Sequence, residues 1–220
     1  AVAKDDHAAH DSHAKDKPAA AGHGHAEGNP AEKAYDILKR GNKRFVKGYM
    51  NRTWVPQDVR ASLVSGQKPH TIIVSCSDSR VPPELVFDQK LCEIFIIRTA
   101  GETLDFAAIG SIEYAVSHLG SKLLLVLGHT SCGAVKAALG TLNGGDAGSP
   151  SLNQLVADIH PRLISYKDKK PTDNVAEEST VNAGGVAKDL ITRSKIIETA
   201  VNEHKLTIKT ALYDLATGVV

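Results

Sequence analysis

Residues 71–80 read Thr-Ile-Ile-Val-Ser-Cys-Ser-Asp-Ser-Arg, a short apolar run that turns directly into a polar segment. Such a β-branched run is typical of a buried strand, which we expect over 71–75. Two further apolar runs follow at 94–97 and 123–127. The second is entirely apolar, as expected of a strand in the middle of a sheet. A fourth segment, 206–215, alternates enough to be a closing strand.

Helical segments are expected between and around these strands. The segment 32–47 has the spacing of an amphipathic helix, and another helix can be capped by Asp105 and ended by Gly120. The expected helices are 32–47, 59–64, 82–86, 106–119, 134–139, 151–166 and 175–204, the last one broken at Gly184 and Gly185. Because helices separate the strands, we expect an α/β fold. It would have a mainly parallel sheet flanked by helices and an N-terminal helical arm, in one domain over 31–220.

The composition excludes several classes of protein. Of the 220 residues, 42% are hydrophobic and 23% are charged, which is ordinary for a globular chain. The formal net charge of +1 gives no field that would attract nucleic acid, so no nucleic-acid partner is expected. No apolar run approaches the roughly 18 residues of a membrane span, so no membrane partner is expected either.

The first thirty residues differ from the rest, because they contain almost no large apolar side chain that could offset the entropy of ordering. We expect a disordered His-rich tail over 1–30, with its histidines at His7, His10, His13, His23 and His25. Two interpretations stay open: a weak metal-gathering tail and a solvated leader whose histidines do nothing. The chain starts with Ala-Val-Ala and has no apolar signal core, which fits an exported protein after cleavage. We expect a periplasmic location, with a cytoplasmic one as the alternative.

Three potential metal ligands follow two of the expected strands. Cys76 comes directly after the first strand, and His129 and Cys132 come directly after the third. Strand ends of a parallel sheet deliver their side chains to one edge. Each residue alone could be an inert thiol or a structural histidine, but together they match the three ligands of a catalytic zinc site with one open position. Cys92 lies in an apolar stretch and is predicted to be a packed core thiol.

Asp78 and Arg80 lie two and four residues beyond the first thiol. If the strand geometry persists, Asp78 points to the same side as Cys76. A guanidinium in fork geometry keeps a carboxylate ionised and oriented, which suits catalysis beside a metal. The alternative is a structural ion pair that fixes the loop. Gln67 and His70 precede the first strand, and by spacing alone they are loop residues.

Several motifs resemble β-class carbonic anhydrase over roughly 32–215. They include Cys-Ser-Asp-Ser-Arg-Val-Pro-Pro-Glu at 76–84, Ile-Arg-Thr-Ala-Gly at 97–101, Gly-Ser-Ile-Glu-Tyr-Ala-Val at 110–116 and Gly-His-Thr-Ser-Cys-Gly-Ala-Val at 128–135. The resemblance implies one Zn²⁺ per subunit, a catalytic Asp–Arg dyad, and a homodimer or dimer of dimers whose N-terminal helices embrace the partner. It assigns the metal to Cys76, His129 and Cys132, catalysis to Asp78 and Arg80, and substrate contact to Gln67, Phe95, Ala100, Tyr114 and Gly133.

Some positions depart from or refine the family pattern. The residue at Ala100 is often larger in the family, so the pocket is expected to be roomier here. One subgroup of the family binds an inhibitory bicarbonate beside a tryptophan, and this chain has Ile73 at that position. The difference argues against such an allosteric site in this chain, although Arg98 matches the subgroup. The resemblance implies that Gln67 reaches the substrate across a subunit boundary.

The resemblance implies reversible hydration of carbon dioxide to bicarbonate and a proton, by a zinc-bound hydroxide that the Asp–Arg dyad orients. Two thiolates would neutralise the metal, so activity is expected to rise on the alkaline side of neutral. Two other functions stay open: a carbon disulfide or carbonyl sulfide hydrolase on the same fold, and a non-catalytic zinc-holding protein. Whether water or Asp78 fills the fourth zinc position also stays open.

Overall fold

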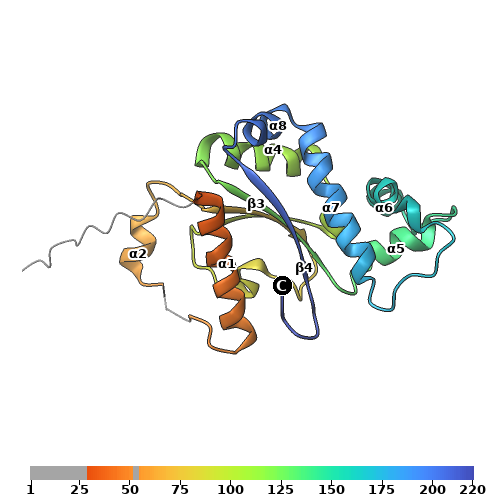
Figure 1. Ribbon diagram of the computed structural model, residues 1–220, viewed down its shortest axis with the longest axis horizontal. Helices are drawn as coiled ribbons and strands as arrows, with labels where there is room; N and C mark the ends of the chain where they lie inside the picture. Colours follow the sequence, from red (N-terminus) through yellow and green to blue (C-terminus); the bar gives the residue numbers. More distant parts are fainter. Residues whose placement is uncertain (1–28, 52–54) are drawn as a thin grey trace, which may run out of the picture.

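A single parallel sheet organises the computed structural model, which describes residues 29–51 and 55–220 (Figure 1). Within these residues its order is β2-β1-β3-β4, and every neighbouring pair is parallel. The strands are β1 (Thr71–Cys76), β2 (Ile94–Thr99), β3 (Leu123–His129) and β4 (Thr207–Tyr213). The expected α/β fold with a mainly parallel sheet and an N-terminal helical region is confirmed.

The two central strands are buried along their whole length, whereas β2 and β4 are the partly exposed edges. Strands covered on both faces need apolar side chains on both, which explains the unbroken runs of β1 and β3. The register pairs Cys76 with Thr99 and His129 with Tyr213, so all four strands end at the same edge. The sheet therefore brings the ligands that follow β1 and β3 together.

Helices cover both faces of the sheet and its carboxyl edge. They are α1 (Pro30–Val46), α2 (Gln57–Ser62), α3 (Pro83–Val86), α4 (Phe106–Tyr114), α5 (Gly133–Thr141), α6 (Pro150–Leu163), α7 (Ala176–Arg193) and α8 (Lys195–Asn202). A π-helical turn (Ala115–Leu119) extends α4, and short 3₁₀ turns form at Ala100–Glu102 and Ile164–Tyr166. None of the described helices is long and apolar enough to cross a membrane.

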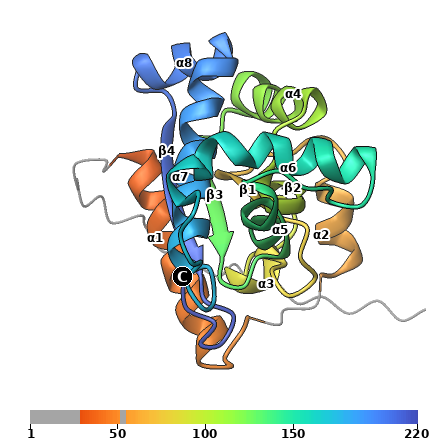
Figure 2. The same ribbon diagram turned by 90° about the vertical axis from the view of Figure 1, so that its right-hand side faces the viewer.

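Alternate side chains of the central strands pack into two separate hydrophobic cores, one on each face of the sheet. Ile72 and Val74 pack with residues of α4, α7 and α8, while Ile73 packs on the other face with α1 and α3. Figures 1 and 2 show α1 and α4 on opposite sides of the sheet. A third core lies between α5 and α6, side by side in Figure 2, and includes Cys76 and Cys132. These two thiols are thus part of the packed interior.

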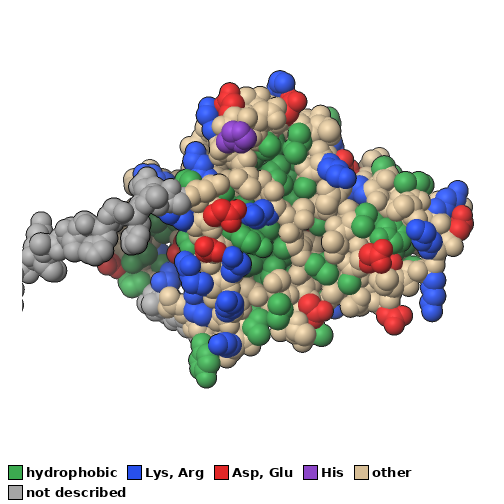
Figure 3. All heavy atoms as spheres, in the orientation of Figure 1, with side chains coloured by type: hydrophobic (Ala, Val, Ile, Leu, Met, Phe, Trp, Pro, Cys, Tyr) green, Lys and Arg blue, Asp and Glu red, His purple; other side chains and the backbone are tan. Residues whose placement is uncertain are grey.

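The N-terminal helix α1 is docked on the sheet of its own chain. Asn29 caps it, its side chain accepting a hydrogen bond from the Ala31 backbone N–H at 3.0 Å. Ala31, Ala34 and Leu38 are buried against the sheet. The opposite face is basic, as the gathered Lys and Arg side chains over α1 in Figure 3 show, and it includes Lys33, Lys39, Arg40, Lys43 and Lys47. The amphipathic pattern read from the sequence is confirmed.

The predicted break at Gly184 and Gly185 is wrong, because α7 runs through both residues and ends at Arg193. The chain breaks at Ser194, whose hydroxyl caps α8 by accepting from the Ile197 N–H at 3.2 Å. Gly185 serves packing instead, since a Cβ there would lie 2.7 Å from the Arg162 side chain. Gly185 therefore allows the Arg162 side chain to pack against α7 and does not interrupt the helix.

Cys92 is not the packed core thiol that its apolar neighbours predicted. It is partly exposed in the turn before β2, with a φ of 71°, and its Sγ accepts a hydrogen bond from the Lys68 N–H at 3.3 Å. The apolar stretch that follows it forms the edge strand β2, in which only Ile97 is buried and the other side chains are partly exposed. Of the predicted His-rich tail over 1–30, residues 1–28 lie outside the described residues, and Asn29 and Pro30 form the start of α1.

Candidate metal centre and active site

Three potential ligands meet at the carboxyl edge of the sheet. Cys76 is the last residue of β1, His129 is the last residue of β3, and Cys132 caps α5. All three are buried, and their ligand atoms lie within 4.8 Å of one another. The two Sγ atoms are 4.0 Å apart. Two thiolates on one tetrahedral zinc would be about 3.8 Å apart, so the pair already has the required spacing.

The imidazole of His129 is oriented as a ligand. Its Nδ1 lies 2.9 Å from the Thr130 carbonyl oxygen, which can only accept, so Nδ1 carries the proton. Nε2 therefore has a free lone pair, and this atom is buried without a hydrogen-bond partner among the described residues. An orphaned buried nitrogen is unfavourable unless something binds it. A metal ion between the two thiols and Nε2 would satisfy it.

The loop that presents His129 and Cys132 is tied to the end of β4. The Thr130 N–H donates to the Tyr213 carbonyl at 3.0 Å, and the Thr130 hydroxyl accepts from the Leu215 N–H at 3.0 Å. Ser131 adopts a left-handed φ of 57°, which turns the chain so that Cys132 faces back toward Cys76. Hydrogen bonds to the end of β4 thus fix the loop that carries His129 and Cys132.

The two thiols share one proton. Their hydrogen bond lowers the pKa of Cys76 to about 4, and the same bond together with burial raises the pKa of Cys132 well above its ordinary value. One sulfur is therefore a thiolate and the other keeps the proton. A divalent cation binding to both sulfurs would displace that proton.

Asp78 and Arg80 form a bidentate ion pair at the edge of this cluster. Arg80 Nε donates to Asp78 Oδ1 at 2.9 Å, and Nη2 donates to Oδ2 at 2.7 Å. The Arg80 side chain, followed by its backbone N–H, holds the pKa of Asp78 well below its usual range. Asp78 Oδ2 also lies 3.9 Å from His129 Nε2. An ionised carboxylate thus faces the position that a metal would occupy.

Arg98 supports this loop from the neighbouring strand, a role that spacing did not reveal. Its Nε donates to the Cys76 carbonyl at 3.0 Å, and its Nη2 donates to the Asp78 carbonyl at 2.6 Å. Both partners are backbone atoms, so no sequence pattern points to them. Arg98 therefore fixes the backbone on both sides of Ser77.

The substrate-contact residues implied by the resemblance fall into two groups. Ala100 and Gly133 lie at the carboxyl edge of the sheet. Ala100 precedes Gly101, whose N–H donates to Cys76 Sγ at 3.4 Å, and Gly133 follows Cys132. Gln67 is exposed and precedes β1, a six-residue strand that spans about 20 Å. It therefore lies at the amino end of the sheet, away from the cysteine–histidine cluster of its own chain.

Phe95 and Tyr114 are also separated from the cluster. Phe95 pairs with Ile72, four residues before Cys76 on the same strand, which places it about 13 Å away along the sheet. Its ring contacts that of Tyr114 at a centroid distance of 6.5 Å, and Tyr114 is 48% exposed. These two residues form a surface pair that one chain cannot bring to its own metal cluster. His70, which binds Gln89 at 3.1 Å, is a structural residue.

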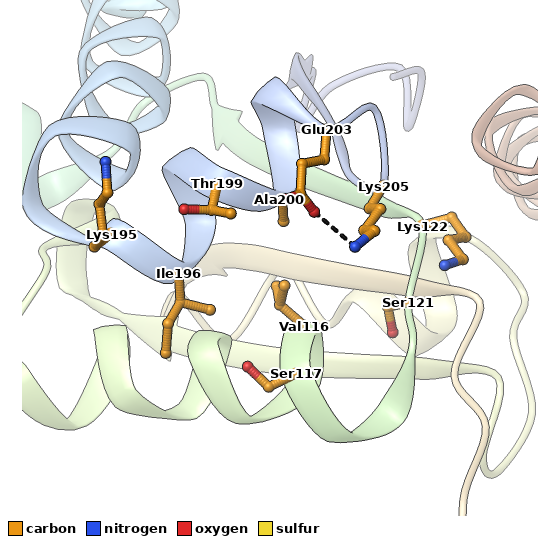
Figure 4. A pocket seen from close by; sticks show the side chains of 10 residues that line it. All are labelled: Val116, Ser117, Ser121, Lys122, Lys195, Ile196, Thr199, Ala200, Glu203 and Lys205. Carbon is orange, nitrogen blue, oxygen red and sulfur yellow. Dashed lines mark ion pairs between the residues drawn. The ribbon is translucent and has the colours of Figure 1, made fainter.

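A separate cavity of about 410 Å³ lies between the π-helical turn and α8 (Figure 4). It is at the amino ends of β3 and β4, opposite the metal cluster, and one of its lysines, Lys205, pairs with Glu203 at 2.6 Å. Within the described part of the chain, none of the residues that line it is a cysteine or histidine, so this cavity offers no sulfur or imidazole donor for a metal.

Comparisons with known proteins agree with this geometry. A family model described as carbonic anhydrase matches residues 71–220. The chain is 39% identical over 186 residues to carbonic anhydrase 2 of Mycobacterium tuberculosis, covering 84% of this chain and 89% of that protein. Among solved structures, the β-carbonic anhydrase CcaA superimposes with a TM-score of 0.67 at 24% identity, over 84% of this chain and 92% of that one. A tetrameric β-carbonic anhydrase of Sordaria macrospora gives 0.65 at 20% identity, over 85% and 94%.

Proposed function

This chain belongs to the β-class carbonic anhydrase family, and we propose that it interconverts carbon dioxide and bicarbonate at the cluster of Cys76, His129 and Cys132. The single observation that supports this site most directly is the buried, unpartnered Nε2 of His129. The two thiols at 4.0 Å supply the remaining donors. Sulfur and imidazole donors in this number are typical of zinc.

Zn²⁺ held there would lower the pKa of bound water and so supply a nucleophile near neutral pH. Two anionic thiolates and a neutral imidazole balance the +2 charge, so this donor set acidifies water less than three histidines would. We therefore expect turnover to increase from neutral to alkaline pH. The thiol pair also loses its shared proton on metal binding, which makes zinc uptake weaker at acid pH.

Asp78 is proposed to orient the attacking hydroxide: its Oδ2 accepts a hydrogen bond from the hydroxide O–H. Arg80 keeps the carboxylate ionised, so Asp78 acts as an acceptor throughout the working pH range rather than as an acid. With its proton directed at Asp78, the hydroxide oxygen has a lone pair free for the carbon of carbon dioxide. The new C–O bond gives bicarbonate, and the proton lost from water goes to solvent.

We further propose that Asp78 remains on Arg80 and leaves the fourth metal position to water. Both carboxylate oxygens accept hydrogen bonds from the guanidinium, and the Arg80 backbone N–H adds a third at 2.9 Å. Moving the carboxylate onto the metal would weaken these charge-assisted bonds, which hold both of its oxygens on Arg80. The intact dyad therefore supports the open arrangement.

A homodimer would complete the substrate site. Gln67 precedes β1, Phe95 lies in the amino half of β2, and Tyr114 of α4 packs on Phe95, so all three are displaced along the sheet from the cysteine–histidine cluster of the same chain. In a pair of subunits they can approach the partner's cluster instead. The structural relative from Sordaria macrospora is described as tetrameric, which is consistent with such pairing.

Stopped-flow hydration of carbon dioxide, measured with the zinc content of the same sample, tests the proposed function. We expect about one zinc per chain and turnover that is lost when zinc is removed and regained when it is restored. Carbon disulfide is offered in a parallel assay. Faster turnover of carbon disulfide than of carbon dioxide, or full zinc occupancy without turnover of either, would overturn the proposal.

A further inference from the structure

A buried chain of hydrogen bonds connects the Cys76 thiol with helix α7. The Gly101 N–H donates to Cys76 Sγ at 3.4 Å. The carbonyl oxygen of Gly101 accepts from Asn182 Nδ2 at 2.9 Å. Asn182 is fully buried and is 81 residues away in the sequence. The short turn Ala100–Glu102 thus contacts the ligand sulfur on one side and Asn182 on the other.

The Asn182 amide is fully used, and its orientation is fixed by its neighbours. Nδ2 also donates to Glu102 Oε2 at 3.0 Å, and Oδ1 accepts from Arg162 Nη1 at 3.3 Å. A carbonyl oxygen can only accept and a guanidinium can only donate, so the amide cannot be reversed. Arg162 is itself held by Asp158 at 2.8 Å and Asp189 at 2.7 Å.

The turn that Asn182 holds is an unfavourable one. Gly101 and Glu102 have φ values of 65° and 54°, so two consecutive residues are left-handed, and the second of them is not glycine. Glu102 is also almost completely buried, and burial followed by the charge of Cys76 raises its pKa well above the usual range. A turn of this kind persists only where its surroundings hold it.

We propose that Asn182 is a positioning residue for the metal ligand Cys76: by fixing the turn Ala100–Glu102, it keeps the Gly101 N–H on the ligand sulfur. An N–H···S hydrogen bond orients the thiolate and withdraws electron density from it. Outer partners of metal ligands contribute about 10–100-fold to metal affinity. This inference rests on the proposed zinc site but not on the substrate that the site turns over.

Asn42 provides a matched control. It is also a buried asparagine, 6% exposed, and its amide likewise donates two hydrogen bonds and accepts one, all of them with backbone partners. Its Nδ2 donates to the carbonyls of Val86 at 3.1 Å and Gly218 at 2.8 Å, and its Oδ1 accepts from the Val220 N–H at 3.1 Å. None of these three partners is hydrogen-bonded to Cys76, His129 or Cys132 within the described residues. Asn182→Ala and Asn42→Ala therefore each remove three hydrogen bonds of a buried amide, and only the first variant removes one that leads to Cys76.

Zinc release to a chelator is measured on the full, zinc-loaded protein under conditions in which circular dichroism shows both variants folded. Zinc is expected to dissociate about 10–100-fold faster from Asn182→Ala than from wild type, and at the wild-type rate from Asn42→Ala. In the cobalt-substituted proteins, the sulfur-to-metal charge-transfer band should shift in Asn182→Ala alone. Equal release rates and unshifted bands in both variants would overturn the proposal.

A measurement on the wild-type protein keeps the test valid if Asn182→Ala does not fold. In protein loaded with cadmium-113, the Gly101 amide proton is expected to show scalar coupling to the metal through Cys76 Sγ. Absence of that coupling overturns the inference. Because neither readout uses carbon dioxide, the proposal can fail while hydration activity is retained, and it can hold in a protein that turns over another substrate.

Discussion

Gly101, whose N–H donates to Cys76 Sγ, has no room for an added methyl group. A Cβ there would lie 2.8 Å from both Ala134 Cβ and Ile159 Cδ1, and the residue has a φ of 65°. Left-handed backbone costs alanine about 1–2 kcal/mol, and overpacking a core costs about 1–3 kcal/mol. Alanine regains about 0.4–1 kcal/mol by restricting the unfolded chain. We expect Gly101→Ala to lower the free energy of unfolding by about 3 kcal/mol.

Gly184→Ala is the matched control, because the same substitution should raise the free energy of unfolding there instead of lowering it. Gly184 lies inside α7, and a Cβ there would meet nothing within 4 Å. Alanine in a helix interior is more stable than glycine by about 0.5–1 kcal/mol. Urea unfolding of both variants, followed by circular dichroism with and without zinc, measures the two changes. Equal signs for the two variants, or an unchanged stability for Gly101→Ala, would refute the packing argument.

Three further predictions concern the proposed site and its oligomer. Asp78→Asn should keep zinc but lose about 100-fold or more in hydration rate, as measured by stopped flow, and a rate near wild type would exclude the proposed acceptor role. Because the pKa of Asp78 is depressed in the folded state, its ionised carboxylate stabilises the wild-type protein fully above about pH 3.9, and this stabilisation is lost as the pH falls through the folded-state pKa. Asp78→Asn lacks this contribution, so acid titrations should show the two proteins converging in stability at low pH. Inactive Gln67→Ala and Asp78→Asn subunits, mixed and reassembled, should regain activity in hybrid dimers, and no regain would contradict a shared site. His129→Ala should abolish zinc binding by mass spectrometry, whereas Cys92→Ser should bind zinc as wild type does.

The strands and the ligand cluster could be predicted because they depend on local pattern and simple geometry. The apolar runs of β1 and β3 are dictated by burial on both faces, and a parallel sheet places their ends together. Cys76 and His129 are at those ends, so their proximity follows from the sequence. The Asp78–Arg80 pair is two residues apart and forms within one loop.

What could not be predicted depends on contacts between distant segments. Whether a glycine breaks a helix or admits a neighbour depends on what lies beside it, as Arg162 does beside Gly185. Arg98 and Asn182 support the cluster through backbone atoms, which carry no residue-specific signal. Cys92 was misjudged because an apolar sequence does not distinguish an edge strand from a central one.

The location of the predicted contact residues separates two properties of this fold. The metal donors are at the ends of adjacent buried strands and in a loop tied to β4, so a single chain positions all three of them. The groups implied to contact the substrate are divided, because Gln67 precedes the amino end of β1 and Phe95 lies near the amino end of the neighbouring strand β2. Strand length alone prevents them from reaching the cluster of their own chain. Under the proposed function, metal binding is therefore a property of the single chain, and a complete substrate site is a property of the pair.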